Sequence, residues 1–191
     1  MDAHEISAFI IAGGRSRRFG EDKALFDYRG MPLIQHVAES IKPAIGKIAI
    51  VADDAERFAF LGIPCYRDII PGMGPFGGLH AALTNADTVR IFVFACDMPG
   101  LDADLIRYMA AESEQYDVTV PYIEGRYEPL HAVYSKSCLA PVEKRIRDVN
   151  RRIISFYGNV SVRPILEQEI LRFIDPKLVF RNINYRHEAE T

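Results

Sequence analysis

Short apolar segments alternate with helical patterns along this chain, and that alternation constrains the fold more than any other feature. Residues 5–12 (EISAFIIA) form an apolar run that ends at glycine, which is typical of a strand buried on both faces of a parallel sheet. Similar strands are predicted at 47–52, 63–66 and 91–95, and helices at 32–42, 53–62 and 102–113. This order predicts βαβ units and a mainly parallel sheet with helices on both faces.

The second half of the chain continues the pattern with two strands that can pair. Residues 117–123 and 130–135 are predicted as the arms of a hairpin. The polar stretch 121–128 is predicted to be a mobile flap over a site. Helical patterns occupy 138–149 and 151–157, and a helical turn is predicted at 167–173.

Length and charge limit the classes of protein that are possible. With 191 residues and no linker or repeat, we expect a single domain over 1–191. The net charge of −3 argues against a nucleic-acid partner. No apolar run approaches the ~20 residues that span a bilayer and no signal-peptide layout is seen, so we expect a cytoplasmic protein without a membrane partner. Cys65, Cys96 and Cys138 are spaced for neither disulfides nor zinc and are interpreted as small buried residues.

The loop after the first strand combines glycine with positive charge. Gly13 and Gly14 allow a ligand to approach the backbone, and unpaired N–H groups in such a turn bind anions. The cations of this loop are Arg15, Arg17, Arg18 and Lys23. Its spacing is not that of Walker A, because Glu21 follows Gly20, nor that of the dinucleotide fingerprint. The combination favours a polyphosphate ligand, and the alternative is a solvated turn.

Two aspartates follow predicted strands, at the edge where open α/β sheets bind ligands. These residues are Asp68 and Asp97. Asp97 is suited to hold Mg²⁺ together with phosphate oxygens; the alternative is a helix cap, a role for which Asp102 is better placed. Polyphosphate, Mg²⁺ and Lys23 together favour transfer at phosphorus, and the sequence has no serine-hydrolase elbow.

The histidines divide into two groups. His80 and His131 lie beside the predicted site, and each is interpreted either as a substrate contact or as a core residue. His4 and His36 are interpreted as terminal and structural residues.

Five segments, in order along nearly the whole chain, resemble the motifs of the molybdenum cofactor guanylyltransferases. Residues 10–25 (IIAGGRSRRFGEDKAL) resemble the signature L-A-G-G-x-S-x-R-F/M-G-x-D-K. The likeness continues at 74–83, 92–101, 129–136 and 182–184. It implies a three-layer α/β/α Rossmann-like nucleotidyltransferase fold with a mostly parallel sheet. It also implies that GTP and molybdenum-bearing molybdopterin give the guanine dinucleotide cofactor and pyrophosphate, with Mg²⁺ as the metal, Mn²⁺ as a substitute, and other molybdenum cofactor-handling proteins as partners.

The resemblance places the family's site residues on this sequence. Lys23, Asp97 and Arg18 are implied as catalytic, and Asp97 also as the metal ligand. The implied GTP contacts are Ile11, Ala12, Gly13, Gly14, Lys23, Asp68, Gly78 and Asp97. The implied molybdopterin side comprises His131, Asn182 and Asn184, and the alternative for the two asparagines is hydrogen bonding within a C-terminal turn.

The sequence departs from the family pattern at two places, and two rival functions stay open. Asp53 stands where the family has Asn, and the segment after 182–184 does not continue as T-P-E-D-L. One rival is a sister nucleotidyltransferase that uses CTP or another nucleotide on molybdopterin or on a small phosphorylated alcohol or sugar. The other is a nucleotide sensor or carrier without catalysis. The segment 12–14 (AGG) favours guanine, because the sister enzymes usually have A-A-G, and Lys23 with Asp97 favours an enzyme.

Overall fold

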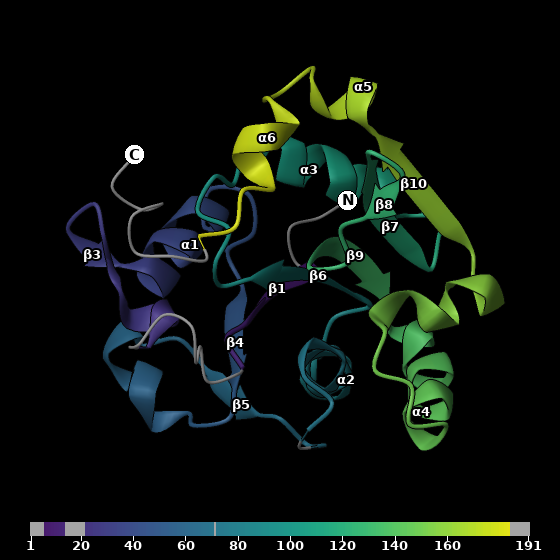
Figure 1. Ribbon diagram of the computed structural model, residues 1–191, viewed down its shortest axis with the longest axis horizontal. Helices are drawn as coiled ribbons and strands as arrows, with labels where there is room; N and C mark the ends of the chain where they lie inside the picture. Colours follow the sequence, from purple (N-terminus) through teal and green to yellow (C-terminus); the bar gives the residue numbers. More distant parts are fainter. Residues whose placement is uncertain (1–5, 14–21, 71, 184–191) are drawn as a thin grey trace.

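A mainly parallel β-sheet forms the centre of the protein (Figure 1). The computed structural model describes residues 6–13, 22–70 and 72–183. The strands lie in the order β10 (Val162–Leu166), β7 (Val118–Ile123), β9 (His131–Ser135), β6 (Arg90–Ala95), β1 (Ile6–Ile11), β4 (Ile48–Ala52) and β5 (Cys65–Arg67), and β8 (Arg126–Tyr127) pairs with β7. β9 is antiparallel to both neighbours, whereas the other strands of this order are parallel to one another. The predicted sheet is confirmed.

β1 lies in the middle of the sheet and is buried on both faces. All of its residues, Ile6–Ile11, are buried. Ile6, Ala8 and Ile10 belong to the core on one face, and Phe9 and Ile11 belong to the core on the other. Because successive side chains of a strand point to opposite faces, such a strand needs apolar residues on both. Ser7 is the polar residue of β1, and its hydroxyl is hydrogen-bonded to that of Thr88 at 2.7 Å.

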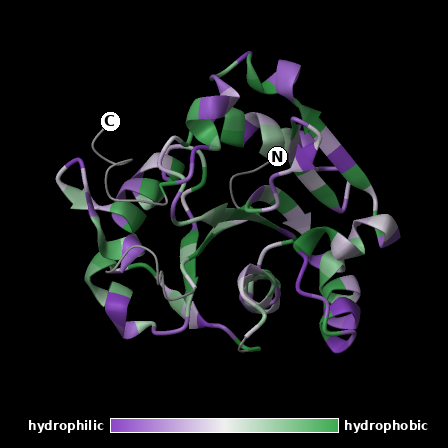
Figure 2. Ribbon diagram, in the orientation of Figure 1, coloured by the Kyte–Doolittle hydropathy of each residue, from purple (hydrophilic) through white to green (hydrophobic). Residues whose placement is uncertain are grey.

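Helices cover both faces of the sheet and give three layers (Figure 1). The core of one face includes residues of α1 (Leu33–Ile41), α3 (Ala103–Glu112), α5 (Glu167–Ile170) and α6 (Pro176–Val179). The other core includes residues of α2 (Pro75–Asn85) and α4 (Leu139–Arg147). Apolar residues gather along the strands, whereas hydrophilic residues lie on the outer helices (Figure 2). This is the α/β/α arrangement that the resemblance implies.

The shorter elements differ most from the sequence-based expectation. They are the 3₁₀ helices η1 (Lys23–Leu25), η2 (Glu56–Leu61), η3 (Lys136–Cys138) and η4 (Ile153–Asn159), and a small sheet of β2 (Asp27–Tyr28) and β3 (Met31–Pro32). The helices predicted at 53–62 and 151–157 are present, as the 3₁₀ helices η2 and η4 and not as α-helices. η2 ends at Gly62, whose φ of 63° is left-handed, and so short a segment gains little from α-helical propagation. β10 was not predicted, because Ile165 is its only buried residue.

The predicted hairpin over 117–135 is confirmed. Thr119 lies opposite Val133 in the antiparallel pair of β7 and β9. The polar stretch 121–128 is itself paired, because Tyr122 lies opposite Tyr127 and the turn between them has positive φ at residues 124 and 125. This stretch is therefore a β-hairpin at the carboxyl end of β7, and its role as a flap stays a prediction.

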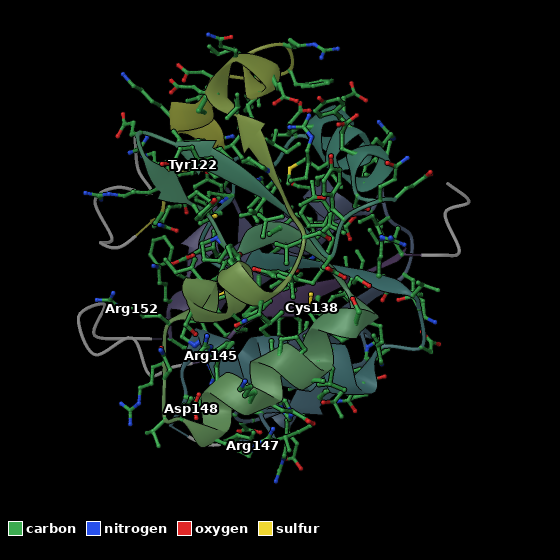
Figure 3. The ribbon with its side chains drawn as sticks, turned by 90° about the vertical axis from the view of Figure 1, so that its right-hand side faces the viewer. Tyr122, Cys138, Arg145, Arg147, Asp148 and Arg152 are labelled. Atoms are coloured by element: carbon green, nitrogen blue, oxygen red, sulfur yellow. The ribbon has the colours of Figure 1, made fainter. Side chains whose placement is uncertain are left out.

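α4 ends in a cluster of charged side chains (Figure 3). Its last turn contains Lys144, Arg145 and Arg147. Cations at this end of a helix interact favourably with its dipole. Nη2 of Arg145 also donates to Oδ1 of Asn159 at 2.9 Å. These basic residues therefore stabilise the end of the helix and its contact with the following segment.

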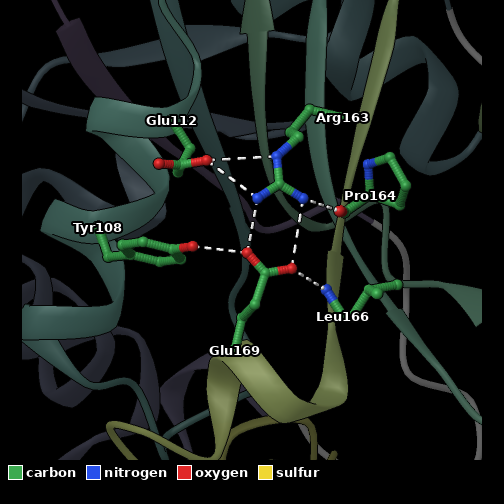
Figure 4. Close-up of polar contacts among 6 residues, drawn as sticks. All are labelled: Tyr108, Glu112, Arg163, Pro164, Leu166 and Glu169. Atoms are coloured by element: carbon green, nitrogen blue, oxygen red, sulfur yellow. Dashed lines mark hydrogen bonds and ion pairs between the residues drawn. The ribbon is translucent and has the colours of Figure 1, made fainter.

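An ion-pair network ties β10 to α3 and α5 (Figure 4). Nη2 of Arg163 donates to Oε2 of Glu112 at 3.0 Å and to Oε1 of Glu169 at 2.6 Å. Glu169 also accepts from the hydroxyl of Tyr108 and from the backbone N–H of Leu166. Burial raises the pKa of Glu169, but the hydrogen bonds from Arg163, Tyr108 and Leu166 outweigh it and lower the pKa to about 2.

Glu169→Gln is expected to lower the free energy of unfolding by about 2 kcal/mol at pH 7, because it leaves Arg163 without its closest carboxylate. The pKa of Glu169 is lower in the folded protein, so its contribution is complete above about pH 5 and is lost as the pH falls toward 2. Urea unfolding between pH 7 and pH 4 measures both effects. Glu39→Gln, at an exposed ion pair with Lys42, is the control, and equal stabilities of the two variants would contradict the expectation.

Candidate active site

Lys23 and Asp97 meet at the carboxyl edge of the sheet. Lys23 follows β1, and Asp97 follows β6, the strand beside it. Nζ of Lys23 donates to Oδ2 of Asp97 at 2.7 Å, although the two residues are 74 positions apart. The side chains are only 10% and 25% exposed. A desolvated ammonium needs a charged partner, and Asp97 supplies one. Both residues were predicted from the sequence as site residues, and the structure brings them together.

The backbone around Lys23 is held by Asp22. Asp22 caps η1, because its Oδ1 accepts from the N–H of Ala24 at 3.2 Å. Its Oδ2 forms an ion pair with Nη2 of Arg57, a residue of η2. A short 3₁₀ helix has little stability of its own, so this cap and ion pair help to fix the position from which Lys23 reaches Asp97.

The backbone of Asp97 is fixed from two sides. The N–H of Cys96 donates to the carbonyl of Ile11 at 3.2 Å, which continues the pairing of β6 with β1. The carbonyl of Asp97 accepts from the N–H of Ile183 at 3.0 Å. The C-terminal segment therefore reaches the site, and it brings the half-buried Asn182 with it. Residues 182–184 were the last of the five matching segments in the sequence.

A pocket lies beside the Lys23–Asp97 ion pair. It is lined by Ile11, Ala12, Gly13, Asp22, Lys23, Ala24, Pro75, Ala95, Cys96, Asp97 and Leu130. The predicted backbone contacts at 11–13 thus line the same pocket as the predicted catalytic pair. Desolvation raises the pKa of the Cys96 thiol to about 12, so this thiol is protonated at neutral pH in the arrangement described.

Asp97 has the chemistry needed for one metal–oxygen bond. Its Oδ2 accepts from Lys23, whereas its Oδ1 accepts no hydrogen bond from any residue in the described ranges. Within those ranges, no three His, Cys, Asp or Glu side chains converge on a common metal position. A single carboxylate nevertheless fits Mg²⁺, which commonly takes one or two carboxylates together with water and phosphate oxygens.

Asp68 lies two strands away from Lys23, after the edge strand β5. It is half-buried, and its Oδ1 accepts from the N–H of Ile70 at 2.9 Å. Burial raises the pKa of Asp68, and the negative charge of Asp53 raises it further. Asp53 itself follows β4 and is exposed. The two aspartates are therefore neighbours at the same edge of the sheet as the Lys23–Asp97 pair.

Gly78 has a packing role in the structure. A Cβ atom at this position would lie 2.7 Å from Cγ2 of Ile11, a residue of the pocket. The glycine therefore lets α2 lie close to the end of β1. Gly78 is buried. Its predicted contact with GTP stays a prediction.

His131 is enclosed in the core behind the pocket. Its ring packs edge-on against Phe92, Phe94 and Phe180, with ring centroids 5.3 to 5.4 Å apart. Neither ring nitrogen has a hydrogen-bond partner among the described residues, and burial lowers the pKa to about 3. His131 is a neutral core residue in this arrangement, which opposes the predicted direct contact with molybdopterin. Its packing on Phe180 instead supports the C-terminal segment near Asp97.

The other predicted residues are placed as follows. His80 lies on α2, and its Nε2 is 3.8 Å from Oε1 of Glu143 on α4, so it faces a helix contact. Arg18, Gly14 and Asn184 lie outside the described residues. The cysteines are unpaired, with Cys138 buried and the other two half-buried.

The sequence reasoning missed the supporting residues of the site. Asp22 belongs to the matching signature, but its cap and its ion pair need the fold to be seen. Arg57 lies in no motif and gave no signal. Leu130 lies in the matching segment 129–136 but was not singled out as a site residue. Pro75 is the first residue of α2 and lines the pocket. Proline is common at the first position of a helix, so Pro75, directly after Gly74, could have marked the start of a helix at the edge of the site.

Comparison with known proteins identifies relatives over most of the chain. Residues 8–161 match the family model described as MobA-like NTP transferase domain. A probable molybdenum cofactor guanylyltransferase of Pelotomaculum thermopropionicum is 38% identical over 94% of this chain and 88% of its own length. A protein of the same description from Carboxydothermus hydrogenoformans is 36% identical over 94% of this chain and 90% of its own.

The fold comparison agrees with the sequence comparison. The crystal structure of molybdopterin-guanine dinucleotide biosynthesis protein A from Archaeoglobus fulgidus superimposes with a TM-score of 0.82 at 25% identity. The match covers 96% of this chain and 95% of that protein. Both lines of comparison therefore extend well beyond the segments that form the pocket.

Proposed function

The chain belongs to the MobA-like NTP transferase family, and on this premise we propose that it transfers GMP from GTP to molybdenum-bearing molybdopterin. The products would be molybdopterin guanine dinucleotide and pyrophosphate. The observation that carries the proposal is the Lys23–Asp97 pair, which lies beside a pocket whose lining includes residues 11–13. Relatives at 36% and 38% identity that are named as guanylyltransferases support the choice of substrates.

The proposed reaction is a displacement at the α-phosphorus of GTP. A terminal phosphate oxygen of molybdopterin forms the new bond to the α-phosphorus, and the bond from the α-phosphorus to the oxygen that bridges to the β-phosphorus breaks. The electron pair leaves with pyrophosphate. Such a step needs positioning and neutralisation of charge more than a protein nucleophile. Lys23 is placed to neutralise phosphate oxygens, and the sequence predicts that N–H groups of the glycine loop bind them.

Asp97 would hold Mg²⁺ through its unbonded Oδ1, and Mn²⁺ is the expected substitute. When bound, the metal supplies charge neutralisation to the phosphates. The contribution of this chain is to keep the carboxylate in place. The contact from Lys23 and the backbone contacts to residues 11 and 183 hold it there.

Two alternatives give different results in the same assay. A sister nucleotidyltransferase would accept CTP, and a sensor or carrier would bind GTP without turnover. The desolvated pairing of Lys23 with Asp97 favours an enzyme, because a binding protein has less need of a carboxylate suited to a metal beside the phosphate site.

We also propose a single domain over 1–191 and a cytoplasmic location, with handover of the pterin through other cofactor-handling proteins. In the described part of the chain, no helix is long and apolar enough to cross a bilayer.

A nucleotide panel tests the proposed function. The purified protein is supplied with Mg²⁺, with GTP or CTP, and with or without molybdopterin, and pyrophosphate release is measured. We expect release from GTP only, and only when both molybdopterin and the metal are present. Equal release from CTP would favour the sister enzymes. Binding of GTP without release under any of these conditions would favour the sensor.

A further inference from the structure

We propose that Gly100 is a positioning residue for Asp97: because Gly100 has no side chain, the backbone of α6 can lie directly on the loop that carries Asp97, and the segment after α6 then holds Asp97 in place. The inference rests on the proposed function, since the carboxylate of Asp97 is the group that would hold Mg²⁺. It goes beyond that function because it makes the C-terminal segment of the chain part of what positions this carboxylate.

Gly100 is in contact with the main chain of α6. A Cβ atom at this position would overlap the carbonyl oxygen of Leu178, and it would lie 2.8 Å from the carbonyl carbon of Leu178 and 3.4 Å from Cα of Val179. Carbon atoms in ordinary contact are about 3.5 to 4.0 Å apart. All three of these atoms belong to the backbone, so no change of rotamer relieves the overlap. A residue with a side chain at position 100 would therefore push α6 away from the loop.

The requirement at position 100 is one of space and not of backbone conformation. Gly100 does not have a positive φ, unlike five other glycines of the described ranges. An alanine is therefore able to take the same backbone angles as Gly100. This makes Gly100→Ala a specific probe, because its main expected effect is to separate the loop from α6.

A second contact joins the same two segments at the site. The N–H of Ile183 donates to the carbonyl of Asp97 at 3.0 Å. Position 100 meets residue 178 and position 97 meets residue 183, so the two segments lie along one another in opposite directions. In Figure 1 the chain after α6 runs beside the connection from β6 to α3. Separation of the segments at Gly100 is therefore expected to break the hydrogen bond at Asp97.

The C-terminal segment is anchored in the core by contacts of its own. Val179 is fully buried, and Ile183 is only 2% exposed. The ring of Phe180 packs edge-on against that of His131, with the ring centroids 5.3 Å apart. Because these contacts do not involve the loop after β6, the segment is able to act as a fixed support for that loop.

The loop after Asp97 needs such a support. Residues 98–102 belong to no helix or strand. The side chain of His36 on α1 hydrogen-bonds the backbone of Pro99, and Ile183 holds the carbonyl of Asp97. A segment without regular backbone hydrogen bonds opens readily unless other contacts fix it. Since a misplacement of about 1 Å can cost about 10² in rate, the position of the Asp97 backbone matters for its carboxylate.

The first test uses the full chain and follows the Ile183 hydrogen bond directly. Amide hydrogen exchange is measured by NMR for the unaltered protein and for Gly100→Ala, without nucleotide or acceptor. We expect Ile183 to exchange about tenfold faster in the variant, whereas Phe9 in the middle of the sheet keeps its protection. Gly158→Ala is the matched control, because Gly158 also lacks a positive φ and a Cβ there meets no atom within 4 Å.

A second measurement connects this hydrogen bond with the carboxylate. Calorimetry gives the affinity for GTP with and without Mg²⁺, and pyrophosphate release is measured with molybdopterin at increasing Mg²⁺. For Gly100→Ala we expect the Mg²⁺ concentration at half-maximal release to rise about tenfold and kcat to fall about tenfold, with GTP affinity in the absence of Mg²⁺ changed less than about twofold. A role of Gly100 in folding alone would lower the melting temperature and leave the Mg²⁺ requirement unchanged.

Variants of Ile183 test the same contact independently of Gly100. Ile183→Pro removes the N–H that donates to Asp97, whereas Ile183→Val keeps this N–H and only shortens the side chain. We expect Ile183→Pro, but not Ile183→Val, to reproduce the raised Mg²⁺ requirement. Adding Gly100→Ala to Ile183→Pro should raise it little further, because both substitutions act through one hydrogen bond. If Gly100→Ala does not fold, the two Ile183 variants decide the inference.

Three results would overturn the inference. They are an unchanged exchange rate of Ile183 in Gly100→Ala, an unchanged Mg²⁺ requirement in that variant, and an Ile183→Val protein as impaired as Ile183→Pro. The exchange measurement needs neither GTP nor acceptor, and the calorimetry needs no turnover. Absence of pyrophosphate release by the unaltered protein would therefore contradict only the proposed function, whereas absence of any effect of Mg²⁺ on its GTP affinity would contradict both.

Discussion

Asp97→Asn is expected to lower kcat for pyrophosphate release by about 10³ while the fold is retained. The substitution keeps the size of the side chain but removes its charge. It therefore removes both the anionic partner of Lys23, which lies 2.7 Å away, and the carboxylate proposed to hold Mg²⁺. Loss of one electrostatic stabiliser from a transition state commonly costs about 10² to 10³ in rate, and here two functions depend on one carboxylate.

The measurement is steady-state release of pyrophosphate from GTP at saturating molybdopterin and increasing Mg²⁺. Asp87→Asn is the control, because Asp87 forms an exposed ion pair with Lys47 and has the same chemistry outside the site. Thermal unfolding should be nearly unchanged for the control. An Asp97→Asn enzyme with ordinary turnover would rule out the assignment of the metal to Asp97.

Lys23→Met is expected to lower kcat by about 10² and to raise KM for GTP. Methionine is similar in length, so the packing of the buried stem is largely kept while the ammonium is lost. The charge that would neutralise the phosphates of GTP disappears, and Asp97 is left in a desolvated site without its cation. The second effect gives a distinct signature, because the variant should need less Mg²⁺ for half-maximal residual activity.

Lys42→Met is the matched control for Lys23→Met. Lys42 is an exposed lysine at the end of α1 that pairs with Glu39, so its loss should leave both kcat and KM within twofold of the unaltered enzyme. A Lys23→Met enzyme with normal kcat and normal KM would show that Lys23 is only a structural partner of Asp97. Stability measurements on both variants separate a loss of catalysis from a loss of fold.

The layered fold followed from local sequence pattern to a large extent. The largely apolar run at 5–12 is typical of a strand buried on both faces, and all of Ile6–Ile11 is buried in the structure. Helix α3 was marked by the capping residue Asp102, whose Oδ1 accepts from the N–H of Leu105. Elements that gain stability mainly from their neighbours were missed. β10 has one buried residue and depends on pairing with β7 and on the Arg163 network.

The candidate site divides in the same way. The sequence alone determined the residue types: glycines and a lysine after the first strand, and aspartates after later strands. It also determined the family resemblance, because ordered motifs are a property of the chain. The sequence could not determine whether a motif residue faces the pocket or lies in the core. His131 lies in a matching motif, yet its side chain is enclosed by aromatic rings.

Tertiary structure alone decided the distances that matter for function. Lys23 and Asp97 are 74 positions apart, and only the parallel pairing of β1 with β6 brings them to 2.7 Å. The ion pair between Arg57 and Asp22 likewise joins segments that no local pattern connects, and so does the close approach of Gly77 to the carboxylate of Asp68. The physical reason is that the spacing of apolar residues and the positions of charges are properties of each local segment. The order of the strands and the distances between helices and sheet are set by the packing of the whole chain.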